Sequence, residues 1–472
     1  IHHFTIIIEW IKQFRNVFKD EELRLYLGIV AGSILLIVLN LRGFYDTLGE
    51  TIRHAAFQVS SIMTTTGFST ADFDQWPVFS KGNPDIPAEV YAEMKRKDEA
   101  EFALLRDTYL YGKEQGMTLW IYDEYQWPSG SAFGQVLDTN ADWRATGIEH
   151  IQLVLNKAKG SYSLREHDIA LKLATIKADG KTWTLDTDGA ALKFDLTSEI
   201  KGECILDLYV LRYTDTHEQN RNDFSTLYHV DTLRPDSVAR FIELTHQHYK
   251  DSFGADFSMV EAFFTDEPSQ GNRDQENYIV WTEGLEQKFK EKYGYELELP
   301  LLFEGRTEAA QRMRIHYYSL VAELFKTSYI DQISAWCEQN GTISSGHLLF
   351  EENMNDHVET YGGDFMQIIG GMTIPGADTL WVHPNQLLSE CFIGNHMGLR
   401  FVASAARNAG KSDVMLEYNP SAVSTDDFQK DKMGASIGGI TLTRLFGTTV
   451  YNVINPQMDY SLEQINALNT YV

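Results

Sequence analysis

The chain has 472 residues, of which 43% are apolar and 12% aromatic, and its 40 Lys and Arg face 67 Asp and Glu, for a formal net charge of −27. This length allows two or three domains with a large core. The excess of acid argues against nucleic acid as a partner, because few cations are available to neutralise phosphates. Cys204, Cys337 and Cys391 lie far apart, which predicts small buried thiols and no disulfide framework.

Residues 25–41 form an apolar run without charge, bracketed by Arg24 and Arg42. Seventeen such residues lie at the short end of what spans a bilayer. The run starts too late for a signal peptide and no small-residue cleavage site follows it. We therefore expect a transmembrane helix and membrane association of the N-terminal segment, with a buried soluble helix as the alternative.

A second N-terminal feature, residues 51–77, reads as a short helix followed by a loop. The loop contains Thr64, Thr65, Thr66, Gly67 and Phe68. Threonine hydroxyls and a permissive glycine can aim carbonyl groups at a dehydrated cation. In its surroundings, residues 57–77, this loop resembles the pore loop of Trk/Ktr-type potassium uptake transporters. The resemblance covers about residues 1–81 and implies a potassium site, as one pore loop of the four that such a subunit needs.

The chain changes character at the polar, turn-rich residues 80–87, after which a charged amphipathic helix is expected over 88–115. A strand over 117–122 then leads into acids and aromatics. We interpret four of them as a platform for a sugar, with a capped surface loop as the alternative: Asp123, Glu124, Tyr125 and Trp127.

Short alternating strands over residues 148–215 predict an antiparallel β insertion. Beyond it, strands and helices alternate and each strand ends in polar residues. This pattern predicts an α/β fold, a (β/α)8 TIM-type barrel. The expected strands cover 257–264, 342–347, 379–383 and 414–416, and the expected helices 237–249, 283–293, 308–340, 399–408 and 438–446. The predicted divisions are thus a membrane fragment (1–81), the start of the barrel (82–147), the insertion (148–215) and the rest of the barrel (216–472).

The most informative stretch is Phe263–Pro268, where an apolar strand ends in Asp266 and Glu267. Strand ends of a parallel barrel converge on one face, and glycosidic cleavage needs two carboxyl groups flanking the bond. The sequence has no HExxH, Walker or strand-linked GxGxxG motif to suggest other chemistry. We therefore predict Glu267 as a catalytic residue, the alternative being an acid at a helix start.

Several motifs, taken in order, resemble barrel glycoside hydrolases related to family 106 α-L-rhamnosidases. They are residues 116–131, 264–268, 345–347 with 351–352, 375–378, and Glu417. The resemblance covers about residues 85–472 and implies Glu267 as the general acid. We predict Glu417 as its partner, with Glu352 or Glu351 second. Further substrate contacts are predicted at Asp266, His347, His383, Asn419 and Asn455.

The chain also departs from that group. Phe133 stands where a glycine is usual, and the first strand and helix of the barrel are replaced by the transporter-like residues, so we expect an incomplete barrel. Some relatives hold calcium near the site; no contiguous calcium loop is present, so we predict no metal ligands and keep calcium as an alternative.

The expected function is hydrolysis of a glycoside or oligosaccharide, α-L-rhamnoside-like. Two alternatives are a fragment of a potassium transport subunit and a carbohydrate-binding barrel without activity. The join of two unrelated families at a turn also suggests an artificial or misassembled reading frame.

Overall fold

The computed structural model describes residues 105–114, 116–124, 128–132, 134–214, 228–270, 277–379, 393–418 and 432–453, with Ile34, Val38 and residues 51–53 nearer the N-terminus. The chain divides into two compact units, Ile1–Lys97 and Asp98–Val472. Everything below concerns the second unit unless stated.

The expected transmembrane helix is not supported. Among the residues that are described, no helix has the length and apolar character needed to cross a bilayer. Apart from Ile34 and Val38, which are helical, the segment 25–41 lies outside the described residues. The prediction of a membrane helix, and of membrane localisation through it, is therefore wrong on this finding. The segment's seventeen uncharged residues lie at the lower limit of the range of about 17 to 25 that spans a membrane.

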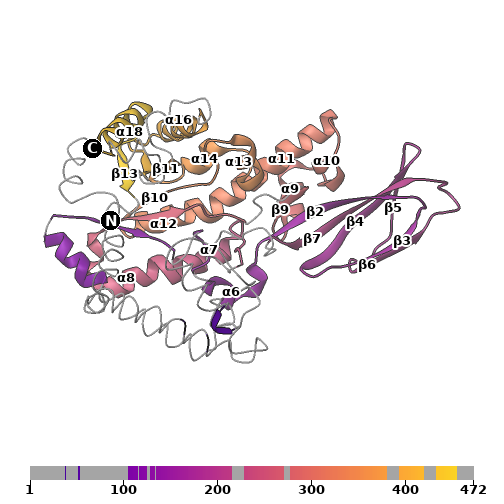
Figure 1. Ribbon diagram of the computed structural model, residues 1–472, viewed down its shortest axis with the longest axis horizontal. Coiled ribbons are helices and arrows are strands. Elements are labelled where there is room, and N and C mark those ends of the chain that lie inside the picture. Colours follow the sequence, from indigo (N-terminus) through magenta and orange to yellow (C-terminus); the bar gives the residue numbers. More distant parts are fainter. Residues whose placement is uncertain are drawn as a thin grey trace, which may run out of the picture. The chain divides into compact units, whose positions relative to one another are not determined.

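A parallel sheet of six strands forms the centre of the second unit (Figure 1). Its order is β1-β8-β10-β11-β12-β13, and every printed pairing is parallel. The strands are β1 (Leu119–Tyr122), β8 (Val260–Asp266), β10 (Ile343–His347), β11 (Ile374–Thr379), β12 (Met415–Tyr418) and β13 (Val450–Val453).

This sheet corrects the prediction of a (β/α)8 TIM-type barrel, which was expected to be incomplete at its first strand. Closure requires the first and last strands to pair. Within the described residues, β1 and β13 are the two edges of a six-stranded sheet. The order of strands along the sheet does follow the chain, as in one side of a barrel, but the described part of the chain does not form an eight-stranded barrel.

Apolar residues explain why these strands are central. In β8, Ala262, Phe263 and Phe264 are buried, and in β12 all four residues are buried. Strands buried on both faces are expected where helices cover a parallel sheet.

The helices between the strands begin and end at recognisable signals. α7 (Pro235–Ile242) starts with proline, whose missing N–H costs nothing at that position. The Thr307 hydroxyl caps α11 (Glu308–Phe325) by accepting from the Ala310 N–H at 3.2 Å. Gly294 ends α9 (Leu285–Tyr293) in the left-handed conformation.

Two long helical stretches each contain one π-helical turn. The first runs from α7 through η4 (Glu243–Gln247) to α8 (His248–Phe253), and the second from α11 through η6 (Lys326–Ile330) to α12 (Asp331–Gln339). The remaining elements of this part are α6 (Gln135–Thr139), η3 (Ala141–Trp143), η5 (Gly254–Met259), α10 (Leu299–Phe303), α13 (Met354–Tyr361), α14 (Phe365–Ile369), α16 (Ile393–Asn408) and α18 (Lys432–Phe446).

An antiparallel sheet follows β1 in the sequence and has its own apolar cluster. Its order is β5-β4-β7-β2-β9, and its strands are β2 (Thr146–Leu155), β4 (Asp168–Ala178), β5 (Lys181–Thr184), β7 (Cys204–Tyr213) and β9 (Tyr278–Trp281). A separate pair joins β3 (Lys159–Ser163) to β6 (Ala191–Asp195). β9 follows β8 in the chain and forms one edge of this sheet, so the sheet includes a strand from outside the predicted insertion.

Candidate active site

The carboxyl ends of neighbouring strands bring the predicted acids together. His347, the last residue of β10, lies opposite Asp266, the last residue of β8. On the next pair of strands, Asp378 of β11 lies opposite Glu417 of β12. Four polar side chains therefore occupy one edge of the sheet, the edge at which α/β enzymes bind their ligands.

Glycine 346 allows β10 to approach β8 closely. Its φ is +143°, and a Cβ built there would lie 2.1 Å from the Thr265 carbonyl oxygen. Only glycine fits a position with both features. The close approach fixes the place of the following residue, His347, beside Asp266.

His347 is the centre of the site. Its Nε2 lies 2.7 Å from Glu417 Oε2 and 3.2 Å from Asp266 Oδ1. Its Nδ1 faces the Leu348 carbonyl oxygen at 3.1 Å and Glu351 Oε1 at 3.7 Å. All four neighbours are acceptors, which suits an imidazolium with two N–H groups. Burial by itself would lower the pKa of His347, but the hydrogen bonds and charges of Asp266 and Glu417 raise the pKa well above its ordinary value.

Asp266 is held on both sides. Its Oδ2 accepts from the Tyr122 hydroxyl at 3.0 Å, while Oδ1 faces His347. Its main chain exchanges two hydrogen bonds of 2.8 Å with Ser129, one to the Ser129 hydroxyl and one from the Ser129 N–H. Tyr122 was not predicted as a site residue, although it stands directly before the predicted platform. Asp266, His347 and Glu417 thus form a line of contacts that begins at Tyr122.

Glu267 follows β8 directly and is half-buried. Its φ is +45°, a left-handed conformation that is uncommon for glutamate, and its N–H donates to the His347 carbonyl at 3.3 Å. One carboxylate oxygen each from Asp266 and Glu267 and a ring nitrogen of His347 all lie within 4.8 Å of one another. Strained backbone held in place by its surroundings is typical of functional positions.

The two further candidate acids differ sharply. Glu351 is buried, its Oε1 accepts from the Leu348 N–H at 2.9 Å, and burial raises its pKa well above the ordinary value. Glu352 is exposed. Asp378, which was quoted only as part of a motif, is largely buried, and burial raises its pKa to about 7. Of these acids, Asp378 shares the strand-end edge with Glu417.

The platform acids hold their own loop. Glu124 Oε2 accepts from the N–H groups of Gly130, Ser131 and Ala132 at 3.1, 2.8 and 2.8 Å. Asp123 is buried and its Oδ1 accepts from the Ser129 hydroxyl at 2.6 Å. These contacts explain why both acids occur here, and sugar contacts by Asp123 and Glu124 stay a prediction.

The other predicted site residues lie outside the described residues. They are Tyr125, Trp127, His383, Asn419, Asn455 and the filter-like Thr64, Thr65, Thr66, Gly67 and Phe68. Their predicted roles, like the division of the chain into four segments, stay predictions.

The calcium implied by the family resemblance does not fit the cluster of Asp266, Glu267 and His347. Calcium prefers six to eight oxygen ligands, whereas the cluster offers one nitrogen and two carboxylates.

Comparisons with known proteins find sequence similarity to transporters and a structural likeness to one hydrolase. No protein family's sequence profile matches the chain. Over 68 residues, 14% of each chain, it is 43% identical to the Trk system potassium uptake protein TrkH of Halomonas elongata. Over 79 residues it is 30% identical to TrkH of Salmonella typhimurium and of Escherichia coli K12, covering 16% of each chain. The chain thus matches about one seventh of the length of these relatives.

Among solved structures, one similar chain is a rhamnosidase from Novosphingobium sp. PP1Y. The likeness has a TM-score of 0.37 and 17% sequence identity, and it covers 58% of this chain and 25% of that one.

Proposed function

We propose that the α/β part of the chain hydrolyses a glycosidic bond. The observation that carries the proposal is the meeting of Glu267, Asp266 and Glu417 around one buried imidazole at the carboxyl edge of a parallel sheet. Glycoside hydrolysis needs one carboxyl group to protonate the leaving oxygen and a second to activate water or attack the sugar.

The contacts suggest how the roles divide. Glu417 forms an ion pair with His347. This contact supports Glu417 as the carboxylate that faces the developing positive charge on the sugar. Glu267 follows the strand end and is only half-buried, which leaves it accessible to a substrate. We assign Glu267 as the acid and Glu417 as its partner, with His347 and Asp266 as positioning residues.

The first substrate to test is an aryl α-L-rhamnoside, because the sequence motifs resemble rhamnosidases. The full chain and Glu267→Gln would be assayed on aryl rhamnosides with good and poor leaving groups. Loss of an acid should reduce turnover by about 10²- to 10⁴-fold on a poor leaving group. It should reduce turnover much less on a dinitrophenyl leaving group, which departs without a proton.

The matched control is Glu166→Gln, since the Glu166 side chain is 91% exposed in the antiparallel sheet region. It should behave like the wild type. If Glu267→Gln lowered turnover relative to the wild type by the same factor on both leaving groups, the role assigned to Glu267 would be removed. Sugar binding by the wild type without any hydrolysis would instead favour the carbohydrate-binding alternative.

A further inference from the structure

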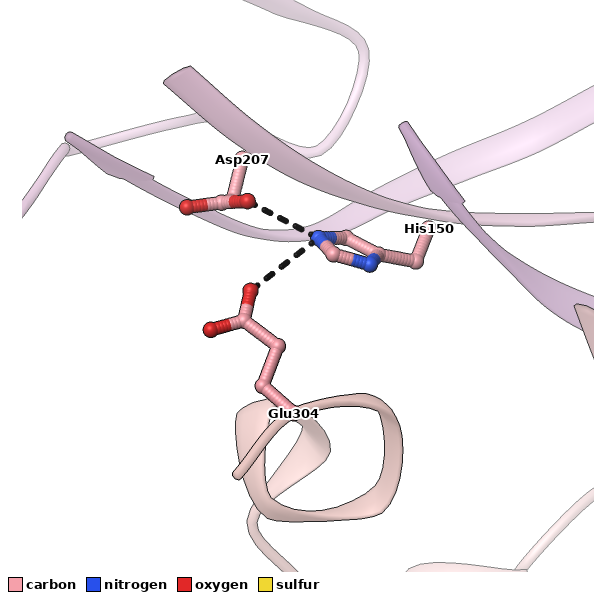
Figure 2. A group of neighbouring side chains, drawn as sticks. All are labelled: His150, Asp207 and Glu304. Carbon is pink, nitrogen blue, oxygen red and sulfur yellow. Dashed lines mark hydrogen bonds and ion pairs between the residues drawn. The ribbon is translucent and has the colours of Figure 1, made fainter. Parts of the chain in front are cut away.

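A second cluster lies away from the strand-end edge, in the antiparallel sheet (Figure 2). His150 comes from β2, Asp207 from β7, and Glu304 directly follows α10. Figure 2 shows the two carboxylates converging on the same ring nitrogen of His150. His150 Nε2 lies 2.9 Å from Asp207 Oδ1 and 3.4 Å from Glu304 Oε1.

We propose that His150, Asp207 and Glu304 bind a divalent transition metal ion of the zinc type. The site is independent of the proposed hydrolysis. Imidazole and carboxylate are ligands that Zn²⁺ accepts at about 2.0 to 2.2 Å. Tetrahedral ligands at that distance lie roughly 3.4 Å from each other. The two measured separations, 2.9 and 3.4 Å, are close to this value, so small side-chain adjustments would admit the ion.

The surroundings hold the ligands ready. His150 stacks on the Tyr209 ring at 4.7 Å, and Gln152 donates to Asp207 Oδ1 at 3.0 Å. The Asp207 side chain is fully buried, whereas that of Glu304 is 32% exposed and gives the ion a way in. Glu304 Oε1 is buried and, within the described ranges, has no hydrogen-bond partner, although it faces His150 Nε2.

Lys177 is the competitor of the metal. Its Nζ lies 3.0 Å from Asp207 Oδ2 and pairs with Glu304 Oε2. Lys177 therefore offsets part of the negative charge of the two carboxylates when no metal is bound. The Lys177 side chain is 28% exposed on a flexible stem, so its ammonium group can turn to solvent when an ion enters.

A bound ion would join two parts of the fold. His150 and Asp207 belong to paired strands, opposite Tyr209 and Gln152 respectively, while Glu304 follows a helix of the other apolar cluster. Coordination would fix the antiparallel sheet to α10. One ligand position would remain for water, because three protein ligands converge among the residues that the structure describes.

The test is a calorimetric titration of the chelator-treated full chain with ZnCl₂ at pH 7, together with the thermal midpoint with and without Zn²⁺. The wild type should bind, and the Glu304→Gln and His150→Ala variants should each bind at least about 100-fold more weakly at this site. Glu304→Gln keeps the side-chain shape, so it protects the test against a folding failure of His150→Ala.

Lys177→Met gives the distinctive result. Without its competitor, Zn²⁺ should bind more tightly, and Zn²⁺ should raise the thermal midpoint of this variant more than that of the wild type. His347→Gln serves as the matched control, because it removes the imidazole of the other cluster of one histidine and two acids. Zinc binding that is lost in His347→Gln but unchanged in Glu304→Gln would overturn the proposal. The proposal would also fail if neither the wild type nor Lys177→Met bound zinc at 1 mM, since a Kd of 1 mM corresponds to a binding free energy of about −4 kcal/mol.

Discussion

His347 and Glu417 lie 70 positions apart in the sequence, and His347 Nε2 reaches Glu417 Oε2 at 2.7 Å in the folded chain. His347 is 1% and Glu417 6% exposed, so water screens this ion pair little. Removal of one partner would leave the other charge buried beside Asp266. The pair therefore links the geometry of the site to the stability of the sheet.

His347→Gln should lower the free energy of unfolding by about 3 kcal/mol near pH 6, because it breaks a buried pair. The pKa of His347 is raised in the folded state, so the stabilisation it brings is complete below the ordinary histidine pKa and is lost as pH rises through the folded value. The difference from the wild type should thus shrink in alkaline solution. Urea unfolding of both proteins between pH 6 and 10 measures this difference in unfolding free energy. A difference that stays constant with pH would contradict the ion pair.

Glu124→Ala should destabilise the protein by about 3 kcal/mol, since it leaves the N–H groups of Gly130, Ser131 and Ala132 without their acceptor. Glu166→Ala is the control, because its side chain is 91% exposed and its loss should cost less than about 0.5 kcal/mol. Chemical denaturation of both variants gives the comparison. Equal effects would show that the loop does not depend on Glu124.

The strand ends at the site could be predicted because each strand has a local signal. Apolar runs before Asp266 and Glu417 indicate β8 and β12 without any knowledge of the fold, whereas β10, with the sequence Ile-Ser-Ser-Gly-His, has a weaker local signal. The contacts among these residues could not be predicted, because they depend on the register of strands far apart in the sequence. For the same reason β9 was missed: it is four residues long and pairs with β2 about 130 positions earlier.

β11 shows a conflict between local and tertiary rules. A strand was expected over 379–383, whereas β11 covers Ile374–Thr379 and contains Pro375 and Gly376. Both residues normally argue against a central strand. Here glycine is needed, because a Cβ at Gly376 would lie 2.4 Å from the Gly346 carbonyl oxygen and 2.3 Å from Met415 Cε. Packing between strands thus selects a residue that local propensity disfavours.

Asp378→Asn should change how stability depends on pH. Burial raises the pKa of Asp378 from 3.8 to about 7, so the folded protein keeps this proton while the unfolded chain loses it. The contribution of Asp378 therefore falls as pH rises from about 4 to about 7. Asparagine does not titrate, so the variant should gain stability relative to the wild type over that range. Urea unfolding at pH 4.5 and 7.5 tests this, and a difference equal at both pH values would show that Asp378 ionises normally.

Gly346→Ala should be among the most damaging single changes at the sheet. Its φ of +143° disfavours any side chain, and the added Cβ would lie 2.1 Å from the Thr265 carbonyl oxygen, so β8 and β10 must separate. We expect a loss of more than about 3 kcal/mol, together with a lower pKa for His347 as it moves from Asp266. Gly180→Ala is the matched control, because Gly180 also has a positive φ, +72°, but a Cβ there would meet nothing within 4 Å. That change should cost only about 1 to 2 kcal/mol. Denaturant unfolding of the two variants separates the cost of backbone strain alone from the cost of strain together with a clash. Similar losses of unfolding free energy in both variants would mean that the close approach of β10 to β8 does not position His347.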